Sequence, residues 1–191
     1  ELGLVGSEMC IRDSYKSVFA VILGTGVGAG FSYDKKIIVG PNKLTGEWGQ
    51  NPIPGPMDDY EKSVKRHCGR IGAIEVFLSG PGLENYYKFI SGSKKSSREI
   101  VSLYKENDSF ANEVMDIYFE RIARSFSTFV NILDPDIIVC GGGMSEIDDI
   151  YSEVPKRIIP YIASNYFLTP IVKAFHGSTS GVRGAAHLWD W

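Results

Sequence analysis

The chain has 191 residues, of which 43% are hydrophobic and 23% are charged, as in an ordinary globular protein with one domain or a large part of two. Its formal net charge of −3 argues against a general affinity for nucleic acid, and no apolar run reaches the ~18–20 residues of a membrane-spanning helix. The N-terminus has no signal-peptide pattern, and three widely spaced cysteines are too few for a disulfide framework. We therefore expect a cytoplasmic protein that contacts neither membrane nor nucleic acid.

The first fourteen residues, ELGLVGSEMCIRDS, have neither a regular hydrophobic period nor a strong turn signal. The string also resembles translated sequencing-adapter sequence. We interpret residues 1–14 as a segment foreign to the domain, with a disordered native terminus as the alternative. The domain itself is then expected to span residues 15–191.

The domain begins with a short apolar run, SVFAVIL at 17–23, which is rich in β-branched residues and predicts a buried strand. After the glycines at 24–30, the composition stays strand-like up to Gly40. Residues 41–60 are rich in proline, glycine, asparagine and aspartate, and we expect them to form a loop.

Helices dominate the prediction after that loop. Two are expected near 72–79 and 82–91, and apolar residues at spacings of three to five predict a helical stretch over 97–133. Its apolar face consists of Ile117, Ile122, Phe126, Phe129, Val130 and Leu133. The elements expected beyond it are a buried strand at 136–140, a turn at 141–143, a helix from Ser145, a strand at 170–174 and a terminal helix at 181–189.

The glycine-rich segment after the first strand, GTGVGA at 24–29, satisfies the G-x-G-x-x-A pattern of dinucleotide-binding turns. That fold needs a helix immediately afterwards, whereas FSYDKKIIVG favours a strand. We therefore expect a tight hairpin whose glycines let backbone N–H groups approach a phosphate, with the Thr25 hydroxyl as a further donor. The phosphate-binding candidates are Gly24, Thr25, Gly26 and Gly28. A glycine hairpin without a ligand is the alternative.

A second glycine run follows the strand DIIVC. Ligands of α/β sheets bind at the carboxyl ends of strands, so we expect Gly141, Gly142 and Gly143 to lie beneath the base or ribose of a nucleotide. A simple packing turn is the alternative for this segment.

The loop GEWGQNPIP at 46–54 contains polar residues that two glycines and two prolines would hold rigid. A sugar needs planar donors and acceptors that face its hydroxyl groups beside an apolar surface. The candidates for this role are Glu47, Gln50, Asn51 and Glu75. Spacing alone favours a surface loop with a solvated glutamate.

Taken together, these segments resemble the ROK family of sugar kinases from about Ser17 to Trp191, and within it the fructokinase or manno(fructo)kinase branch. VFAVILGTGVGAGF is similar to the family's second phosphate loop, GEWGQNPIP to G-E-W-G-H-N-P-L-P, and IVCGGGMS to the adenosine-side turn. HGSTSGVRGAAHLW is similar to the family's terminal segment.

The resemblance implies an α/β, actin-like ATPase (ribonuclease H-like) fold of two domains, of which this chain holds mostly the C-terminal one. It implies transfer of the γ-phosphoryl group of ATP to a hexose, with Mg²⁺ and a carboxylate base. Fructose is the first expectation, then mannose, with glucose and N-acetylglucosamine behind them. The family forms dimers, in part through the long helical region, so a homodimer is expected for the full-length protein.

The run KRHCGRIGAIE at 65–75 resembles the family's zinc knuckle, C-x-C-G-x-x-G-C-x-E, which also uses the histidine of G-E-x-G-H. The family's first cysteine falls on Arg66, the second on Cys68, the third on Ala73 and the histidine on Gln50. One ligand of four remains, and a closed zinc site needs four. We therefore expect no zinc, and a metal-free turn that places Glu75 and Glu47. The family's histidine also contacts the sugar, so Gln50 is expected to alter sugar binding.

Two family elements are absent from the chain: the first phosphate loop, D-x-G-G-T, and the catalytic aspartate after an asparagine. Asp13 lacks the Asn-Asp context and lies in the foreign segment, so we do not assign it as the base. A general base supplies ~10²–10⁴-fold in rate. We therefore expect a C-terminal fragment with little activity of its own.

Three other functions remain open at this point. A repressor of the same family would carry a helix-turn-helix upstream, and a sugar-binding module would bind hexose without turnover. A dehydrogenase would bind NAD, but the helix that this reading needs after Gly28 is missing.

Overall fold

A computed structural model describes residues 14–175 of the chain, and the expected terminal helix at 181–189 lies outside this range. Within residues 14–175, five strands form one mixed sheet in the order β3-β2-β1-β4-β5. The strands are β1 (Ser17–Leu23), β2 (Val27–Tyr33), β3 (Lys36–Ile37), β4 (Ile137–Gly141) and β5 (Ile171–Lys173). The strands predicted at 17–23, 136–140 and 170–174 are therefore confirmed to within one residue.

The glycine-rich segment forms the expected hairpin, because β1 and β2 pair antiparallel with Leu23 opposite Val27. On its other edge β1 pairs parallel with β4, and β4 pairs parallel with β5. The strand-like composition up to Gly40 is broken by a turn at Asp34 and Lys35, whose positive φ angles reverse the chain into the short β3.

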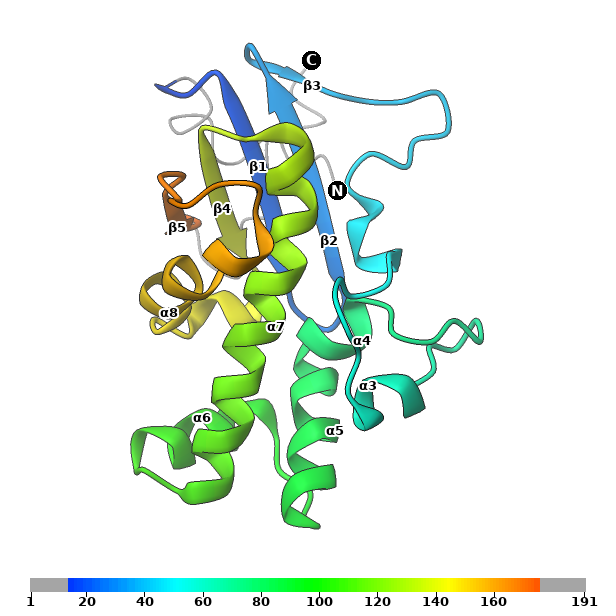
Figure 1. The fold of residues 1–191 in the computed structure, drawn as a ribbon, viewed down its shortest axis with the longest axis vertical. Helices are drawn as coiled ribbons and strands as arrows, with labels where there is room; N and C mark the ends of the chain where they lie inside the picture. Colours follow the sequence, from blue (N-terminus) through cyan, green and yellow to red (C-terminus); the bar gives the residue numbers. More distant parts are fainter. Residues whose placement is uncertain (1–13, 176–191) are drawn as a thin grey trace.

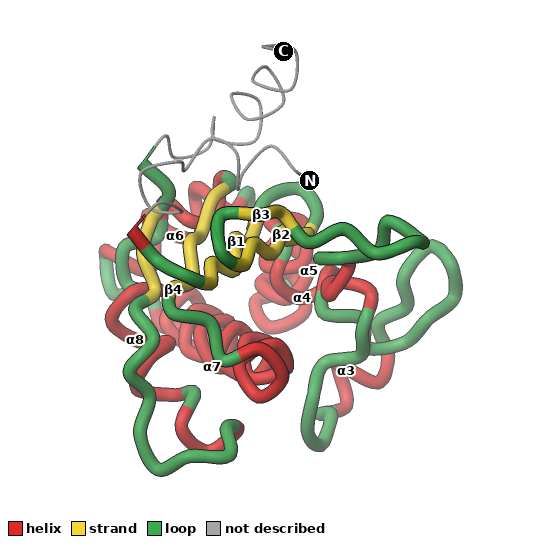
Figure 2. Tube along the Cα trace, turned by 90° about the horizontal axis from the view of Figure 1, so that it is seen from above, coloured by secondary structure: helices red, strands yellow, loops and turns green. Residues whose placement is uncertain are grey.

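The helices are α3 (Asp59–Ser63), α4 (Glu75–Leu78), α5 (Gly80–Ser91), α6 (Ser97–Lys105), α7 (Ser109–Leu133) and α8 (Ile150–Arg157). In the described part of the chain, three short 3-10 helices accompany them: η1 (Glu47–Gln50), η2 (Gly143–Glu146) and η3 (Ile159–Tyr161). Figure 2 shows α7 and α8 on the same side of the sheet.

Two helix predictions and one loop prediction need correction. The stretch at 97–133 is two helices, because Asn107 has a φ of 62° and the Asp108 carboxylate caps a new helix by accepting from Ala111 N. The helix expected from Ser145 is the 3-10 helix η2, and α8 begins only at Ile150. The loop expected at 41–60 contains η1 and the start of α3, where Asp58 and Glu61 form a capping box.

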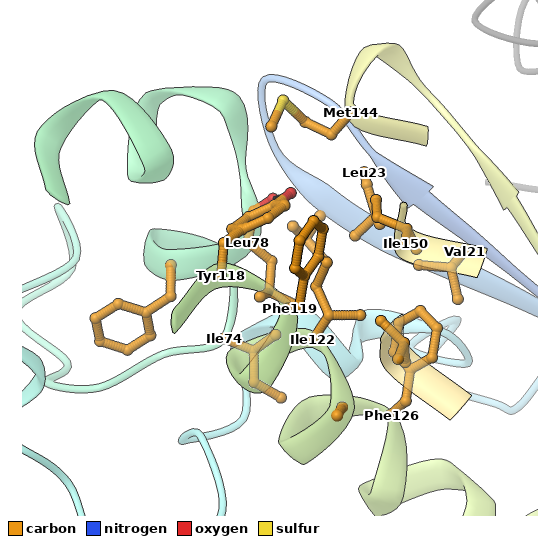
Figure 3. Close-up of a cluster of buried hydrophobic side chains, with 14 of the residues drawn as sticks. Val21, Leu23, Ile74, Leu78, Tyr118, Phe119, Ile122, Phe126, Met144 and Ile150 are labelled. Atoms are coloured by element: carbon orange, nitrogen blue, oxygen red, sulfur yellow. Dashed lines mark hydrogen bonds between the residues drawn. The ribbon is translucent and has the colours of Figure 1, made fainter. Parts of the chain in front are cut away.

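The main core lies between α7 and the sheet. Phe19, Val21 and Leu23 point from β1 into this core, where Phe119, Ile122 and Phe126 of α7 meet them; Figure 3 shows part of the cluster. Of the predicted apolar face, Ile122, Phe126, Phe129 and Val130 are buried, and Ile117 and Leu133 pack against the cluster partly buried. Each fully buried side chain of this size contributes about 1.5–3 kcal/mol, so α7 is the element that fixes the sheet and the loops beside it.

In the range 14–175, no helix is both long enough and apolar enough to cross a bilayer.

Candidate functional site

The two glycine runs lie side by side at the carboxyl ends of β1 and β4. Gly142 has a φ of 89°, and a Cβ atom there would lie 2.4 Å from the carbonyl oxygen of Leu23. Only glycine allows this approach, because both the backbone conformation and the space exclude a side chain. The turn after β1 and the turn after β4 therefore form one main-chain surface.

This surface opens into a cavity of about 710 Å³. Its wall includes the turn residues Gly24, Thr25, Gly142 and Gly143, all of which were predicted from sequence to contact the nucleotide. Other residues that line it include Val101, Met144, Ile147, Glu84, Arg98 and Glu146. Such a cavity combines main chain that can approach phosphate closely with apolar side chains that can hold a base.

The other predicted phosphate residues support the turns without lining the cavity. Gly28 lies inside β2, and its carbonyl oxygen accepts a hydrogen bond from Trp48 Nε1 at 3.2 Å. Gly141 is the last residue of β4 and pairs with Ile22 of β1. Gly26 closes the hairpin turn, since its carbonyl oxygen accepts from Gly24 N at 3.0 Å.

The first turn of α5 forms part of the same wall. Gly80 N donates to the carbonyl oxygen of Gly24 at 2.8 Å, Pro81 has no N–H, and Gly82 N donates to Ser79 Oγ at 3.2 Å. One of the first donors of the helix therefore fixes the hairpin turn, and the other binds the N-cap residue of the helix itself. It offers the cavity the positive end of its dipole rather than free N–H groups.

The 46–54 loop packs along β2 (Figure 1). Gly46 has a φ of 93°, and a Cβ atom there would lie 1.9 Å from the carbonyl oxygen of Ala29. Trp48 is buried next to it and meets Phe126 and Phe129 edge to face, with ring centroids 5.8 and 5.4 Å apart. The tryptophan thus anchors the loop, and the polar residues on either side of it remain partly accessible.

Glu47, Gln50 and Asn51 line a second hollow, of about 770 Å³. Its remaining wall is largely apolar, with Phe31, Leu44, Phe129 and Ile132 among the side chains, and it also contains Arg70. The structure therefore brings together three of the four residues predicted to bind sugar, beside the apolar surface that such a ligand needs.

Glu75, the fourth of these residues, lies against the phosphate turn instead. Two backbone hydrogen bonds join its segment to the loop: Ile53 N donates to Gly72 O at 2.7 Å, and Ile74 N to Asn51 O at 2.9 Å. The Glu75 carboxylate accepts from Val27 N at 3.3 Å through Oε2. It therefore links the loop that carries Glu47 to the first residue of β2.

Arg66 occupies the place that the resemblance gives to the first zinc cysteine. Its Nε donates to Glu75 Oε1 at 2.9 Å, and its Nη1 donates to Cys68 Sγ at 3.6 Å. A guanidinium group is a donor only and cannot ligate a metal ion. The described residues also hold no group of three or more His, Cys, Asp or Glu side chains that could bind one. These residues therefore do not fit a zinc ion.

A buried charge network holds the same loop from the side of α7. Glu61 accepts from Arg121 Nε at 2.9 Å and from Arg124 Nη1 at 3.1 Å, and its side chain is 1% exposed. Arg124 also donates from Nε and Nη2 to the carbonyl oxygen of Pro54, at 2.9 and 2.7 Å. The Arg121 guanidinium lies 4.1 Å from the ring centroid of Tyr86. These contacts pin the chain after Asn51 to the core.

Sequence reasoning missed the roles of Arg66, Glu61, Arg121 and Arg124. Arginines and glutamates within an amphipathic helical pattern are normally read as solvent-exposed, and no local spacing shows that residues 60 positions apart meet. One signal was available: the capping-box pattern of Asp58 and Glu61 marks the start of α3 in a stretch assigned to loop.

Comparison with known proteins gives consistent matches. A family model described as "ROK family" matches residues 7–191. The N-acetyl-D-glucosamine kinase of Vibrio atlanticus (strain LGP32) is 39% identical over 176 residues, which cover 90% of this chain and 58% of that protein. The chain thus spans well under two thirds of the length of this curated relative.

Solved structures show the same fold at lower identity. A glucokinase from Streptomyces griseus, solved in complex with glucose and AMPPNP, matches with a TM-score of 0.83 and 19% identity over 97% of this chain and 65% of that one. A transcriptional regulator, described as a homolog of the E. coli MLC protein, matches with a TM-score of 0.77 and 18% identity over 96% of this chain and 48% of that one. The expected α/β, actin-like fold class is therefore confirmed.

Proposed function

The chain belongs to the ROK family, and from this premise we propose that the protein containing it phosphorylates a hexose with ATP. One observation carries the proposal: the carboxylate of Glu75, a sugar-binding candidate, lies 3.3 Å from the main chain of the phosphate turn at Val27 N. Phosphoryl transfer needs the acceptor hydroxyl and the phosphate to be held within contact distance. A site that joins the two binding regions by one hydrogen bond suits this reaction.

The residues of the chain then have separate tasks. The main chain around Gly24, Thr25 and Gly142 approaches the phosphates, and the apolar side chains of the same cavity hold the base. Glu47, Gln50 and Asn51 present donors and acceptors to the hydroxyl groups of the sugar. ATP supplies the phosphoryl group, and Mg²⁺ neutralises its negative charge during transfer. No described residue is assigned as the base.

N-acetyl-D-glucosamine is the first hexose to test, ahead of the fructose and mannose that the sequence motif favoured. The support is the 39% identity to an N-acetyl-D-glucosamine kinase, which is higher than the identity to the glucokinase structure. Gln50 lies in the hollow with Glu47, and an amide both donates and accepts hydrogen bonds, so it is suited to contact a polar substituent of the sugar.

A coupled assay of ADP release tests this proposal. The protein is expressed from the gene that contains this chain, with any codons upstream of Tyr15 included. It is assayed with N-acetyl-D-glucosamine, fructose, mannose and glucose in turn. We expect one of these sugars to support turnover with ATP and Mg²⁺. Glu47→Gln should then raise the KM for that sugar by at least about 10-fold, since a hydrogen bond to a charged group is lost. Turnover with none of the sugars would contradict the proposal.

A sugar-sensing repressor is the second candidate, because the chain matches the transcriptional regulator almost as well in fold. The same preparation separates the two. A protein that binds hexose without ADP release, and that binds a DNA duplex from which hexose releases it, would favour the repressor. Turnover favours the kinase.

A further inference from the structure

The Arg66 side chain lies at the centre of a short chain of contacts that crosses from the 65–75 turn to the phosphate turn. On one side its Nη1 reaches Cys68 Sγ at 3.6 Å. On the other its Nε reaches Glu75 Oε1 at 2.9 Å, and Glu75 Oε2 accepts from Val27 N at 3.3 Å. The two oxygens of one carboxylate are therefore held by two different segments.

The backbone around Arg66 is itself fixed. Arg66 N donates to Arg70 O at 2.8 Å, and Arg66 O accepts from Gly69 N at 2.8 Å. Lys65 and Ile71 form an isolated β-bridge across the base of the same turn. The hydrogen-bonded turn thus fixes the backbone of Arg66. Its guanidinium group can therefore hold the Glu75 carboxylate in one position.

The ion pair is more sheltered than an ordinary surface pair. The Arg66 side chain is 16% exposed and the Glu75 side chain 24% exposed. Fully exposed pairs contribute little because water screens them and two flexible side chains must be ordered. Here Glu75 begins the short helix α4, whose last residue, Leu78, accepts a hydrogen bond from the buried Tyr118 hydroxyl at 2.8 Å. Little further ordering is then needed to form the pair.

We propose that Arg66 is a positioning residue for sugar binding: its guanidinium holds the Glu75 carboxylate in the orientation that joins the sugar region to the phosphate turn. The inference rests on the proposed kinase function, because it takes Glu75 to contact the sugar. In this chain the Arg66–Glu75 ion pair holds the turn in place of a metal ion, and Arg66 stands where the resemblance places a zinc cysteine. Sugar binding should accordingly be independent of zinc.

Kinetics of three variants test the proposal in the full gene product. Arg66→Met keeps an unbranched apolar stem but removes the charge and the donors of the side chain. We expect it to raise the KM for the sugar by about 10-fold while the KM for ATP changes by less than about 2-fold. Arg66→Lys restores a cation and should return the sugar KM to within about 3-fold of wild type. Lys65→Met, which removes the neighbouring exposed cation, is the matched control and should leave both constants unchanged.

The outcomes separate the inference from the proposed function. If the wild type turns over and Arg66→Met has the wild-type sugar KM, or raises both KM values equally, the inference fails and the kinase function stands. If Arg66→Met fails to fold, Arg66→Lys decides. A sugar KM that exceeds that of Lys65→Met by up to about 3-fold, with an unchanged KM for ATP, supports the positioning role. Any other result for this variant overturns it. Loss of sugar binding on treatment with a zinc chelator overturns it as well. A wild type that phosphorylates no hexose overturns both.

Discussion

On the proposed nucleotide side of the candidate site two turns are fixed by close main-chain packing, whereas on the proposed sugar side arginine–carboxylate bonds hold the chain around the site. Gly142 approaches the backbone of Leu23, at the end of β1, so closely that a single methyl group would push the two segments apart. The sugar side instead depends on Glu61 and Glu75, each bonded to arginine. The first side is intolerant of a side chain at Gly142, and the second is sensitive to the loss of a charge.

Burial distinguishes the two glutamates within the sugar side. Glu61 is 1% exposed and bonds two arginines, while Glu75 is 24% exposed and bonds one. Loss of a buried partner leaves a charge that water cannot reach, so the cost appears in the stability of the whole fold. Loss of a partly exposed partner allows water to replace it, so the effect is confined to the local geometry.

The largest expected effect follows from removal of the buried charge. Glu61→Gln removes the carboxylate that Arg124 bonds and leaves Arg121 with Asp58, 3.3 Å from its Nη2, so it should lower the free energy of unfolding by about 3–5 kcal/mol. Urea denaturation followed by circular dichroism measures it. Lys62→Gln, at the next position and 61% exposed, should change the same quantity by less than about 0.5 kcal/mol. Equal effects of the two substitutions would show that the network does not hold the loop.

The glycine side is tested by a pair of neighbouring substitutions. Gly142→Ala forces a side chain into a backbone conformation that is close to exclusive to glycine and should cost at least about 1–3 kcal/mol, before its contact with Leu23 O is counted. Because the two turns must separate, affinity for a non-hydrolysable ATP analogue should fall as well. Gly143→Ala meets no protein atom within 4 Å and should leave the stability nearly unchanged. Thermal denaturation and isothermal titration of both variants give the comparison.

A smaller and pH-dependent effect is expected at α6, which lines the nucleotide cavity. Ser96→Ala removes the hydroxyl that caps this helix and should cost about 1 kcal/mol at pH 7. Hydrogen bonds from Ser96 lower the pKa of Glu99 in the folded protein, so this carboxylate stabilises the fold above its unfolded pKa of about 4.3. That contribution is lost as the pH falls through the lower, folded pKa. Unfolding free energies at pH 7 and pH 3 should therefore show a smaller gap between wild type and variant in acid.

The smallest expected effect is on the reactivity of the Cys68 thiol, and it tests the contact of this thiol with Arg66. Hydrogen bonds from the Arg70 backbone and the Arg66 side chain lower the pKa of Cys68. Its alkylation by iodoacetamide should therefore have a midpoint below the usual pH of about 8.5. Arg66→Met should raise this midpoint but not abolish the shift, since the backbone donor remains. A Cys10→Ser background leaves one competing thiol, Cys140, whose pKa burial raises to about 12. An unchanged midpoint would argue against the Arg66–Cys68 contact.

Much of the fold could be predicted from the sequence because short segments determine its elements. The run SVFAVIL predicted β1, the missing helix after Gly28 predicted a hairpin rather than a dinucleotide fold, and the spacing in 117–133 predicted the buried face of α7. The errors also had local causes that outweighed periodicity. Asn107 and Asp108 split one helical pattern into two helices, and Gly142 led into a 3-10 turn that delayed α8 to Ile150.

For the site, the sequence by itself determined which residues were candidates, since the glycine runs and the GEWGQNPIP loop are contiguous strings with chemistry of their own. Only the tertiary structure decided how they are grouped: Glu47, Gln50 and Asn51 share one hollow, whereas Glu75 lies at Val27 beside the phosphate turn. It also supplied the arginines, which lie 9 residues from Glu75 and 60 and 63 residues from Glu61. Ion pairs between residues so far apart follow no sequence period. The pairs of Glu61 form because the packing of α7 places Arg121 and Arg124 beside it.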